Sequence, residues 1–234
     1  MDTAGQRVPA VKWNLLTLLR LATVVIILKV TAEIVAGYVD YLPPDFNSEF
    51  LRGRKAYFFG SYQWAFYPHL LFGPWTLLAG LLLVSDKFRS RFPRWHSWLG
   101  RIQVASVLLV ILPSGFWMAL HAQGDVFVKL GFSLLSIVTG ATAFMGWRLA
   151  VKRQFAAHRN WMWRNYVLLG SAVVTRIVGG AFFVCGIDGD WTYTFSAWAS
   201  WLTPLLIYEV IRALRTPATR STISNTPATA KLWQ

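Results

Sequence analysis

The chain has 234 residues, of which 55% are hydrophobic and only 14% are charged, and its formal net charge is +13. A soluble domain carries about 25% charged residues, so these proportions exclude an ordinary water-soluble protein. A basic excess is also typical of nucleic-acid-binding proteins, but here the basic residues lie beside long apolar runs. We therefore expect anionic lipid headgroups, and no nucleic acid, as their partners.

Six apolar runs follow one another along the chain, and each is long enough to cross a bilayer as a helix. Such a crossing needs about 20 residues, and only a helix satisfies every backbone polar group inside the lipid. The sequence therefore predicts an all-α integral membrane protein, a bundle of six transmembrane helices within residues 13–215. We place the spans at 13–38, 64–84, 99–121, 126–148, 161–185 and 193–213.

Two polar pieces flank this transmembrane domain. Residues 1–12 form a short arm, and residues 216–234 are rich in Thr, Ser, Pro and Ala, which predicts a disordered cytoplasmic tail. The first apolar run has the position of a signal peptide. It is too long for one and contains Arg20 and Lys29, so we expect it to stay in the protein as a helix.

Basic residues are divided unevenly between the two sides of the predicted bundle. Sixteen of the 23 Lys and Arg residues lie on one side and four on the other. Because cytoplasmic loops are enriched in Lys and Arg, the basic side is expected in the cytoplasm together with both termini. The sixteen are Arg7, Lys12, Lys87, Arg89, Arg91, Arg94, Arg101, Arg148, Lys152, Arg153, Arg159, Arg164, Arg212, Arg215, Arg220 and Lys231.

The longest connection on the opposite side, residues 39–63, is rich in aromatic residues and begins with Pro43 and Pro44. We expect a connector at headgroup level. A stretch such as 46–59 has the composition of a short interfacial amphipathic helix, and a substrate lid is a further alternative.

The four histidines are the first candidates for chemistry. His69 lies inside the second span and His121 ends the third span on the exterior side, whereas His96 and His158 both lie on the cytoplasmic side. Two imidazoles on neighbouring helices can ligate one haem iron, so His96 and His158 are candidate axial ligands of haem b. The alternatives are helix-capping histidines, another metal or a proton relay. Candidate propionate partners are Arg94, Arg101, Arg159 and Arg164.

Arg176 lies in the middle of the fifth span. A charge at the bilayer centre costs at least about 2.5 kcal/mol, so such residues pair with another charge or line a cavity. Glu33 and Glu209 are the acidic candidates within the spans, although Glu33 has Lys29 four residues before it and Glu209 has Arg212 three residues after it. An anionic ligand is the alternative partner of Arg176.

Other signals of enzyme chemistry are missing from the sequence. Cys185 is the only cysteine, which excludes an intramolecular disulfide and a cysteine-only metal site. Neither a phosphate-binding glycine loop nor a zinc or nucleophile-elbow motif occurs. Whether the protein is an enzyme is left open at this point.

Three motifs resemble a family of bacterial multi-pass membrane proteins known as domain of unknown function 2306. They are His69-x3-Gly73-Pro74, the stretch from His96 to Arg101 and the stretch from His158 to Tyr166, followed by Thr175 and Arg176. Ser97 stands where the family usually has arginine. The resemblance implies a helical membrane protein without an established activity. It implies these family positions: His69, His96, His158, Arg159, Trp161, Arg164 and Arg176.

A shorter stretch, from Trp95 to Gly100, is similar to a fragment of di-haem transmembrane cytochromes b. Our first functional hypothesis is a membrane protein whose cytoplasmic cluster of His96, His158, Arg101, Arg159 and Arg164 binds haem or another anionic ligand. A non-catalytic subunit that packs against membrane-protein partners, and a small-solute transporter with Arg176 on its path, are the alternatives. The expected location is the cell membrane, or the bacterial inner membrane if the resemblance holds.

Overall fold

The computed structural model describes residues 14–215, and within this range the chain forms helices and no β-strand. The predicted arm 1–12 and tail 216–234 lie outside the described residues. The long helices are α1 (Leu15–Ala36), α3 (Gln63–Leu83), α5 (Pro93–Ser106), α6 (Leu112–Leu120), α7 (Val126–Val151), α8 (Phe155–Leu169), α9 (Ser171–Val184) and α10 (Asp190–Arg215). The short elements are η1 (Gly37–Asp40), α2 (Lys55–Tyr57), η2 (Phe58–Tyr62), α4 (Asp86–Arg91) and η3 (Val107–Ile111).

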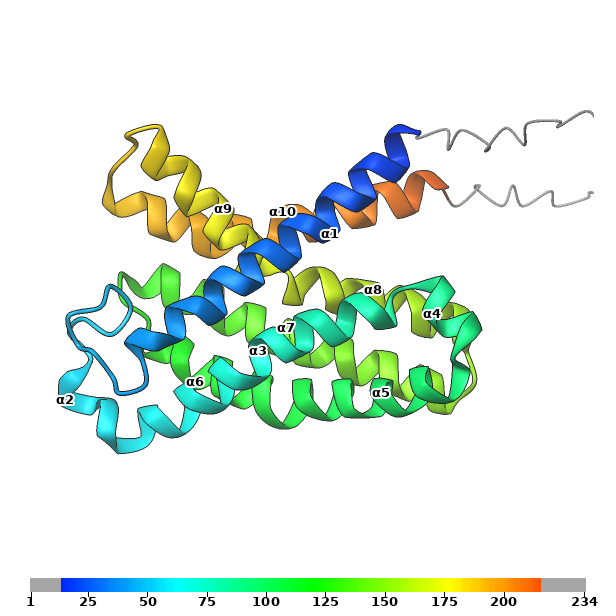
Figure 1. Cartoon of the computed structure of the whole chain (residues 1–234), viewed down its shortest axis with the longest axis horizontal. Coiled ribbons are helices and arrows are strands. Elements are labelled where there is room, and N and C mark those ends of the chain that lie inside the picture. Colours follow the sequence, from blue (N-terminus) through cyan, green and yellow to red (C-terminus); the bar gives the residue numbers. More distant parts are fainter. Residues whose placement is uncertain (1–13, 216–234) are drawn as a thin grey trace, which may run out of the picture.

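Four helical rods pack together as a bundle, which we call the four-helix layer, and three further helices lie along one flank of it (Figure 1). The layer contains α3, the continuous rod α5–η3–α6, α7 and α8, and the flank contains α1, α9 and α10. The chain bends at Gly170, between α8 and α9, so that α9 leaves the layer and packs against α10. The two ends of the described chain, at the start of α1 and the end of α10, lie on the same side of the molecule (Figure 1).

The predicted spans agree with the observed helices. Four segments within residues 14–215 are long and apolar enough to cross a membrane, and they cover the second to fifth predicted spans except for one residue at the end of three of them. They are Lys55–Leu83, Pro93–Leu120, Val126–Val151 and Phe155–Val184. The first and sixth predicted spans coincide with α1 and α10, which have 22 and 26 residues. That all six cross the bilayer stays a prediction.

Proline residues shape the contacts between these helices. Pro74 has no backbone N–H, so it leaves the carbonyl of Leu70, four residues earlier, without its usual helical donor. The hydroxyl of Tyr38, just beyond α1, donates to that carbonyl at 2.5 Å. Pro113 similarly follows the π-helical turn η3, where the N–H of Leu112 bonds to the carbonyl of Val107. The prolines therefore join α1 to α3 and widen the middle of the α5–α6 rod.

Polar side chains hold the interior of the four-helix layer together. The amide of Gln103 on α5 donates to the carbonyl of Thr76 on α3 at 2.9 Å. The amide of Asn165 on α8 donates to the carbonyl of Thr139 at 2.8 Å and to the hydroxyl of Thr142 at 3.1 Å, both on α7. Both amide side chains are almost fully buried. Interhelical hydrogen bonds of this kind stabilise helix packing in lipid, where apolar contacts alone give little selectivity.

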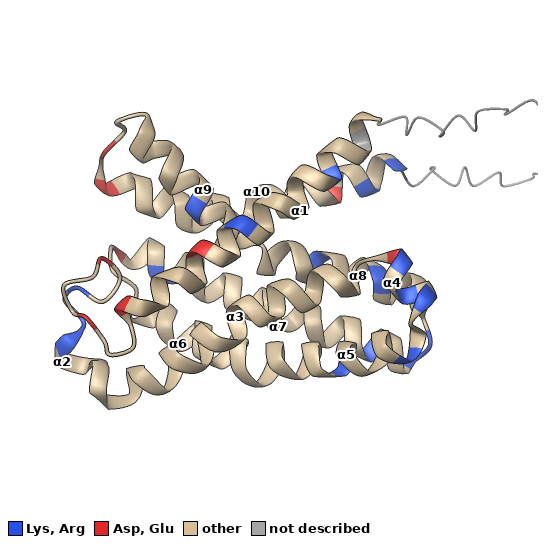
Figure 2. Ribbon diagram, in the orientation of Figure 1, with Lys and Arg blue, Asp and Glu red and all other residues tan. Residues whose placement is uncertain are grey.

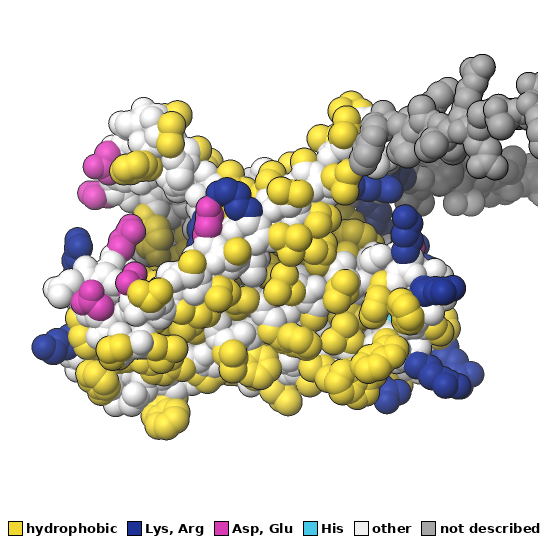
Figure 3. Space-filling model, in the orientation of Figure 1, with side chains coloured by type: hydrophobic (Ala, Val, Ile, Leu, Met, Phe, Trp, Pro, Cys, Tyr) yellow, Lys and Arg dark blue, Asp and Glu magenta, His cyan; other side chains and the backbone are white. Residues whose placement is uncertain are grey.

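The two ends of the layer differ in charge and composition (Figure 2). We call the end that carries α4 and the start of α5 the basic end, since Lys and Arg gather there. At the opposite end lie several acidic residues and the connection from Tyr41 to Tyr62, which we call the aromatic cap. Between the ends the visible surface is largely hydrophobic (Figure 3). This distribution is the one expected of a helical protein that lies across a bilayer.

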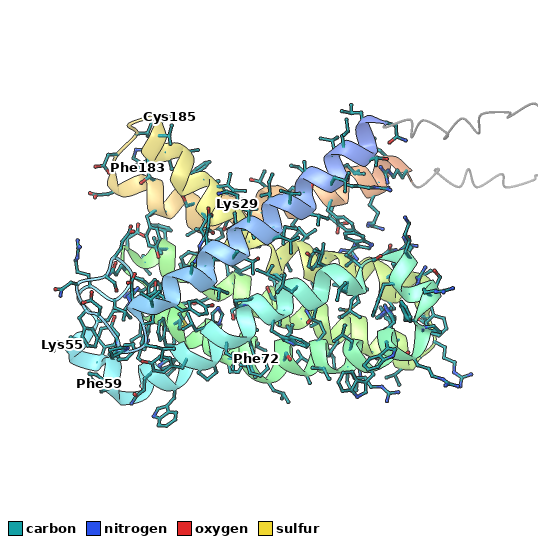
Figure 4. The ribbon with its side chains drawn as sticks, viewed as in Figure 1. Lys29, Lys55, Phe59, Phe72, Phe183 and Cys185 are labelled. Atoms are coloured by element: carbon teal, nitrogen blue, oxygen red, sulfur yellow. The ribbon has the colours of Figure 1, made fainter. Side chains whose placement is uncertain are left out.

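The aromatic cap contains a packed cluster of its own. Leu51, Phe58, Tyr62 and Phe66 are buried together, and further rings from the same stretch pack against them. The rings of Tyr62 and Phe66 stack with centroids 6.1 Å apart. Within the stretch 46–59, which the sequence suggests as a short amphipathic helix, helical structure begins only at Lys55. Lys55 and Phe59 lie at the outer tip of the cap (Figure 4).

Candidate functional site

The two histidines of the basic end come from different helices and lie in the same region. His158 is in the first turns of α8, and its Nδ1 is 2.8 Å from the carbonyl oxygen of Gly146 on α7. His96 is in the first turn of α5, and its Nδ1 is buried without a hydrogen-bond partner. The charge of His158 acts on His96, so the two imidazoles are close enough to interact electrostatically.

The hydrogen bond of His158 fixes which ring nitrogen is left free. A carbonyl oxygen can only accept, so the neutral imidazole of His158 must carry its proton on Nδ1. Its Nε2 then keeps an unshared electron pair. Histidines that ligate metals almost always hold their second nitrogen in this way. His158 is therefore oriented as a ligand would be, and the orphaned nitrogen of His96 shows that the region still lacks an acceptor or donor.

The arginines around this pair fall into two groups. Arg159 donates to Asp86 at 2.9 Å, and Arg164 donates to Glu209 through both Nε and Nη2. Each carboxylate also pairs with a second arginine, Asp86 with Arg89 and Glu209 with Arg212. Arg94 and Arg101 on α5 form no ion pair among the described residues. Arg91, Arg148 and Arg153 form no ion pair among the described residues either, so α5 is one of several sources of unpaired guanidinium groups at this end.

The Arg164–Glu209 pair ties α8 to α10. The Arg164 side chain is 16% exposed and its guanidinium lies 4.7 Å from the ring centroid of Trp161. Glu209 also receives Arg212, at 3.0 Å, as the spacing along α10 indicated. Bidentate charge-assisted bonds of this kind are the strong ones, so the Arg164–Glu209 pair holds α8 against α10.

The other two histidines lie towards the aromatic cap and are not paired with each other. Nδ1 of His69 on α3 is 3.0 Å from the hydroxyl of Ser114, which itself donates to the carbonyl of Val110 at 2.5 Å. The Ser114 hydrogen is thus used, and His69 donates. The imidazole of His69 packs against Gly115, where a Cβ would meet its Cε1 at 3.2 Å. His121 bonds to the carbonyl of Trp117 in its own helix.

Beside Ser114 runs an apolar groove of about 470 Å³ between α3 and the α5–α6 rod. Trp64, Pro68, Leu109, Pro113 and Trp117 form most of its walls. Trp64 and Leu109 are 78% and 75% exposed, so the groove opens onto the face that would meet lipid. An acyl chain would fill such a groove without any specific recognition.

Arg176 on α9 has neither of the acidic partners that the sequence suggested. Glu33 pairs with Lys29 and Glu209 pairs with Arg164 and Arg212. The guanidinium of Arg176 donates to the carbonyl of Ala172 in its own helix at 3.1 Å, and its charge acts on Tyr38 and Tyr41. Lys29 lies near the middle of α1 (Figure 4).

A buried cation that the sequence did not single out lies in the aromatic cap. Arg54 is 3% exposed, and its Nε and Nη1 are buried without hydrogen-bond partners. No carboxylate of the described residues lies within ion-pair distance of it. Its guanidinium lies 4.6 Å from the ring centroid of Phe50 and 5.7 Å from that of Tyr62.

These rings offset only part of the cost of burying Arg54. A desolvated cation–π contact contributes about 2 kcal/mol, whereas burying an unpaired charge costs several kcal/mol even after the protein relaxes. From the sequence, Arg54 was one of four basic residues on the poorly charged side, and nothing distinguished it from its neighbours Arg52 and Lys55. Its burial depends on how the neighbouring segment folds to bring the rings of Phe50 and Tyr62 against it, so a charge count could not reveal it.

A family model described as "Predicted membrane protein (DUF2306)" matches residues 66–212. The chain belongs to this family. The predicted resemblance is thereby confirmed, and the protein is a membrane protein. The part shared with the DUF2306 family contains His69, His96, His158 and Arg176, and it begins after Arg54. Comparison with curated proteins and with solved structures gives no match.

Proposed function

We propose that this DUF2306 protein binds haem b at the basic end and transfers electrons in the membrane, with His96 and His158 as axial ligands. The observation that carries the proposal is the pair of imidazoles from α5 and α8, one with Nε2 left free by its bond to Gly146 and the other with a buried, unpartnered nitrogen. When bound, haem supplies one-electron oxidation and reduction at its iron.

The residues around the pair fit a haem better than a free anion. Arg159 and Arg164 already donate to Asp86 and Glu209, so their N–H groups are less available to a small anion beside His158. Arg94 and Arg101 form no ion pair among residues 14–215, and their guanidinium groups suit propionate carboxylates. Within the same range no cluster of three or more His, Cys, Asp and Glu side chains is arranged for a metal ion. The hypothesis therefore rests on two imidazoles, which is the number that a haem iron needs.

The haem content of the purified protein tests this proposal. The full chain is expressed with added 5-aminolevulinate, purified in mild detergent, and assayed by its absorption spectrum and as the pyridine haemochrome. We expect a Soret band and about one haem per chain, and a loss of haem in His96→Ala and in His158→Ala. His121→Ala is the matched control, since His121 lies at the other end of the same rod, and it should keep its haem. A colourless wild-type protein would refute the proposal.

The orientation belongs to the same proposal. Six crossings by α1, α3, α5–α6, α7, α8–α9 and α10 would place the basic end and both chain ends in the cytoplasm of the bacterial inner membrane. The lysines and arginines of that end would then meet anionic headgroups, which attract each such residue by about 1 kcal/mol.

Transport and a role as a subunit of a larger complex rank behind electron transfer. The transport hypothesis needs Arg176 on an internal path, but Arg176 is exposed on α9, the helix that leaves the four-helix layer. The subunit hypothesis rests on the many exposed aromatic and aliphatic side chains, which lipid would cover equally well.

A further inference from the structure

Arg54 is the one described arginine that combines near-complete burial with the absence of any side-chain hydrogen bond or ion pair. Burying an unpaired charge lowers the stability of a fold, and a ligand that pairs with the charge would offset this cost. Its position in the aromatic cap, at the end of the layer opposite His96 and His158, makes it independent of the proposed haem site.

We propose that the aromatic cap binds a small monocarboxylate with an apolar or aromatic body, whose carboxylate accepts hydrogen bonds from Arg54. This ligand goes beyond the proposed electron transfer, since it uses other residues at the other end of the molecule.

The geometry of the guanidinium selects the chemistry of the ligand. The guanidinium carbon lies 4.6 Å from the ring centroid of Phe50 and 5.7 Å from that of Tyr62, so rings fill part of its surroundings, and a ligand would hydrogen-bond to the N–H groups in the plane of the guanidinium. A planar carboxylate matches the fork of an arginine in that plane. Nε and Nη1 are the buried donors, and Nη2, which also has no partner, reaches the molecular surface.

The surroundings of Arg54 limit the charge and the body of the ligand. Its positive charge acts on the phenol groups of Tyr41 and Tyr62, both in the cap, and of Tyr193 on α10. Acidic side chains lie nearby, because Asp40 and Glu49 act on Tyr41 as well. A dianion would be repelled by these carboxylates and would leave a buried negative charge. A single carboxylate balances Arg54, and the rings of Phe50 and Tyr62 offer its body an apolar contact surface.

The probe for this site is benzoate, with benzamide as its neutral analogue and inorganic phosphate as an anion without a ring. The purified full chain in detergent is titrated with each at constant ionic strength, and thermal unfolding and isothermal titration calorimetry are recorded. We expect benzoate to bind saturably and to raise Tm by about 3 °C at ten times its Kd. Benzamide and phosphate should leave Tm unchanged. Equal shifts with benzoate and phosphate, or none with benzoate, would overturn the proposal.

The variants Arg54→Met and Arg52→Met form a matched pair. Both remove one arginine from the same loop, but Arg52 is exposed and bonds only to the carbonyl of Asn47. Arg54→Met should abolish the benzoate response and leave the unliganded Tm equal or higher, because it removes an unpaired buried charge. Arg52→Met should keep the response.

Arg54→Lys keeps the charge without the planar fork and covers the case in which Arg54→Met does not fold. We expect it to weaken benzoate binding about tenfold. An unchanged Kd in Arg54→Lys, or an unchanged benzoate response in Arg54→Met, contradicts the assignment of Arg54 as the carboxylate-binding residue.

Discussion

The arginines of the basic end and of the aromatic cap differ in exposure and in the groups that surround their charge. At the basic end charges are numerous and exposed, and the least exposed arginine there, Arg164, is paired with Glu209, while the half-exposed Arg159 is paired with Asp86. The cap contains a single fully enclosed arginine, Arg54, and provides it with rings and no carboxylate. The difference teaches that the two ends support two separate proposals: the charge distribution supports the proposed orientation, and the unsatisfied buried arginine supports the proposed binding site.

The largest expected effect concerns the sidedness of the two ends. Cys185 is exposed at the tip of α9, on the same side of the molecule as the aromatic cap (Figure 4). If the basic end is cytoplasmic, a membrane-impermeant maleimide should label Cys185 in intact cells. The control protein carries Cys185→Ser and Ser90→Cys, which moves the single thiol to α4 at the basic end. It should react only after permeabilisation. The reverse pattern would invert the orientation.

The next effect compares the apolar contacts of the two ends. Phe58 is fully buried in the cap, so Phe58→Ala should lower the free energy of unfolding by about 3–5 kcal/mol. Trp95, at the basic end, is 62% exposed, and Trp95→Ala should change it by no more than about 0.5 kcal/mol. Denaturant unfolding of both variants in the same detergent measures the difference. Equal losses would mean that the cap is not a packed core.

A smaller effect separates the two ion pairs of the basic end. Glu209→Gln removes the charge that neutralises Arg164, whose side chain is only 16% exposed, and should cost about 2 kcal/mol. Asp86→Asn removes the partner of two half-exposed arginines and should cost about 0.5 kcal/mol or less. The midpoints of thermal unfolding of the two variants compare them. A larger shift for Asp86→Asn would contradict the ranking.

Much of the helical organisation could be predicted from the sequence, because bilayer length and apolar composition constrain a span locally. The four middle spans end within three residues of the observed segments, but the second begins nine residues earlier than predicted, at Lys55, and the third and fifth begin six residues earlier, at Pro93 and Phe155. The bend at Gly170 was not predicted, since the apolar pattern continues through it. Local pairs were predictable as well: Lys29 with Glu33 and Glu209 with Arg212 are both confirmed.

Contacts between distant parts of the chain escaped the sequence argument. Arg164 and Glu209 are 45 residues apart, and their pairing leaves Arg176 with neither expected partner. The burial of Arg54 depends on how the segment from Phe50 to Phe66 folds so that its aromatic side chains pack together. Hydropathy and charge counts describe each segment separately, so they carry no information about which side chain another segment covers.

Two adjacent residues test most directly whether haem binding depends on a side chain with a free nitrogen or on a charged side chain that is already ion-paired. The Nδ1 of His158 is hydrogen-bonded to the carbonyl of Gly146, which leaves its Nε2 free, whereas the guanidinium of Arg159 is ion-paired with Asp86. The haem content of His158→Gln and Arg159→Gln, purified side by side with the wild type, should fall to near zero in the first and stay near one per chain in the second. A wild type without haem, or equal loss in both variants, would contradict the account.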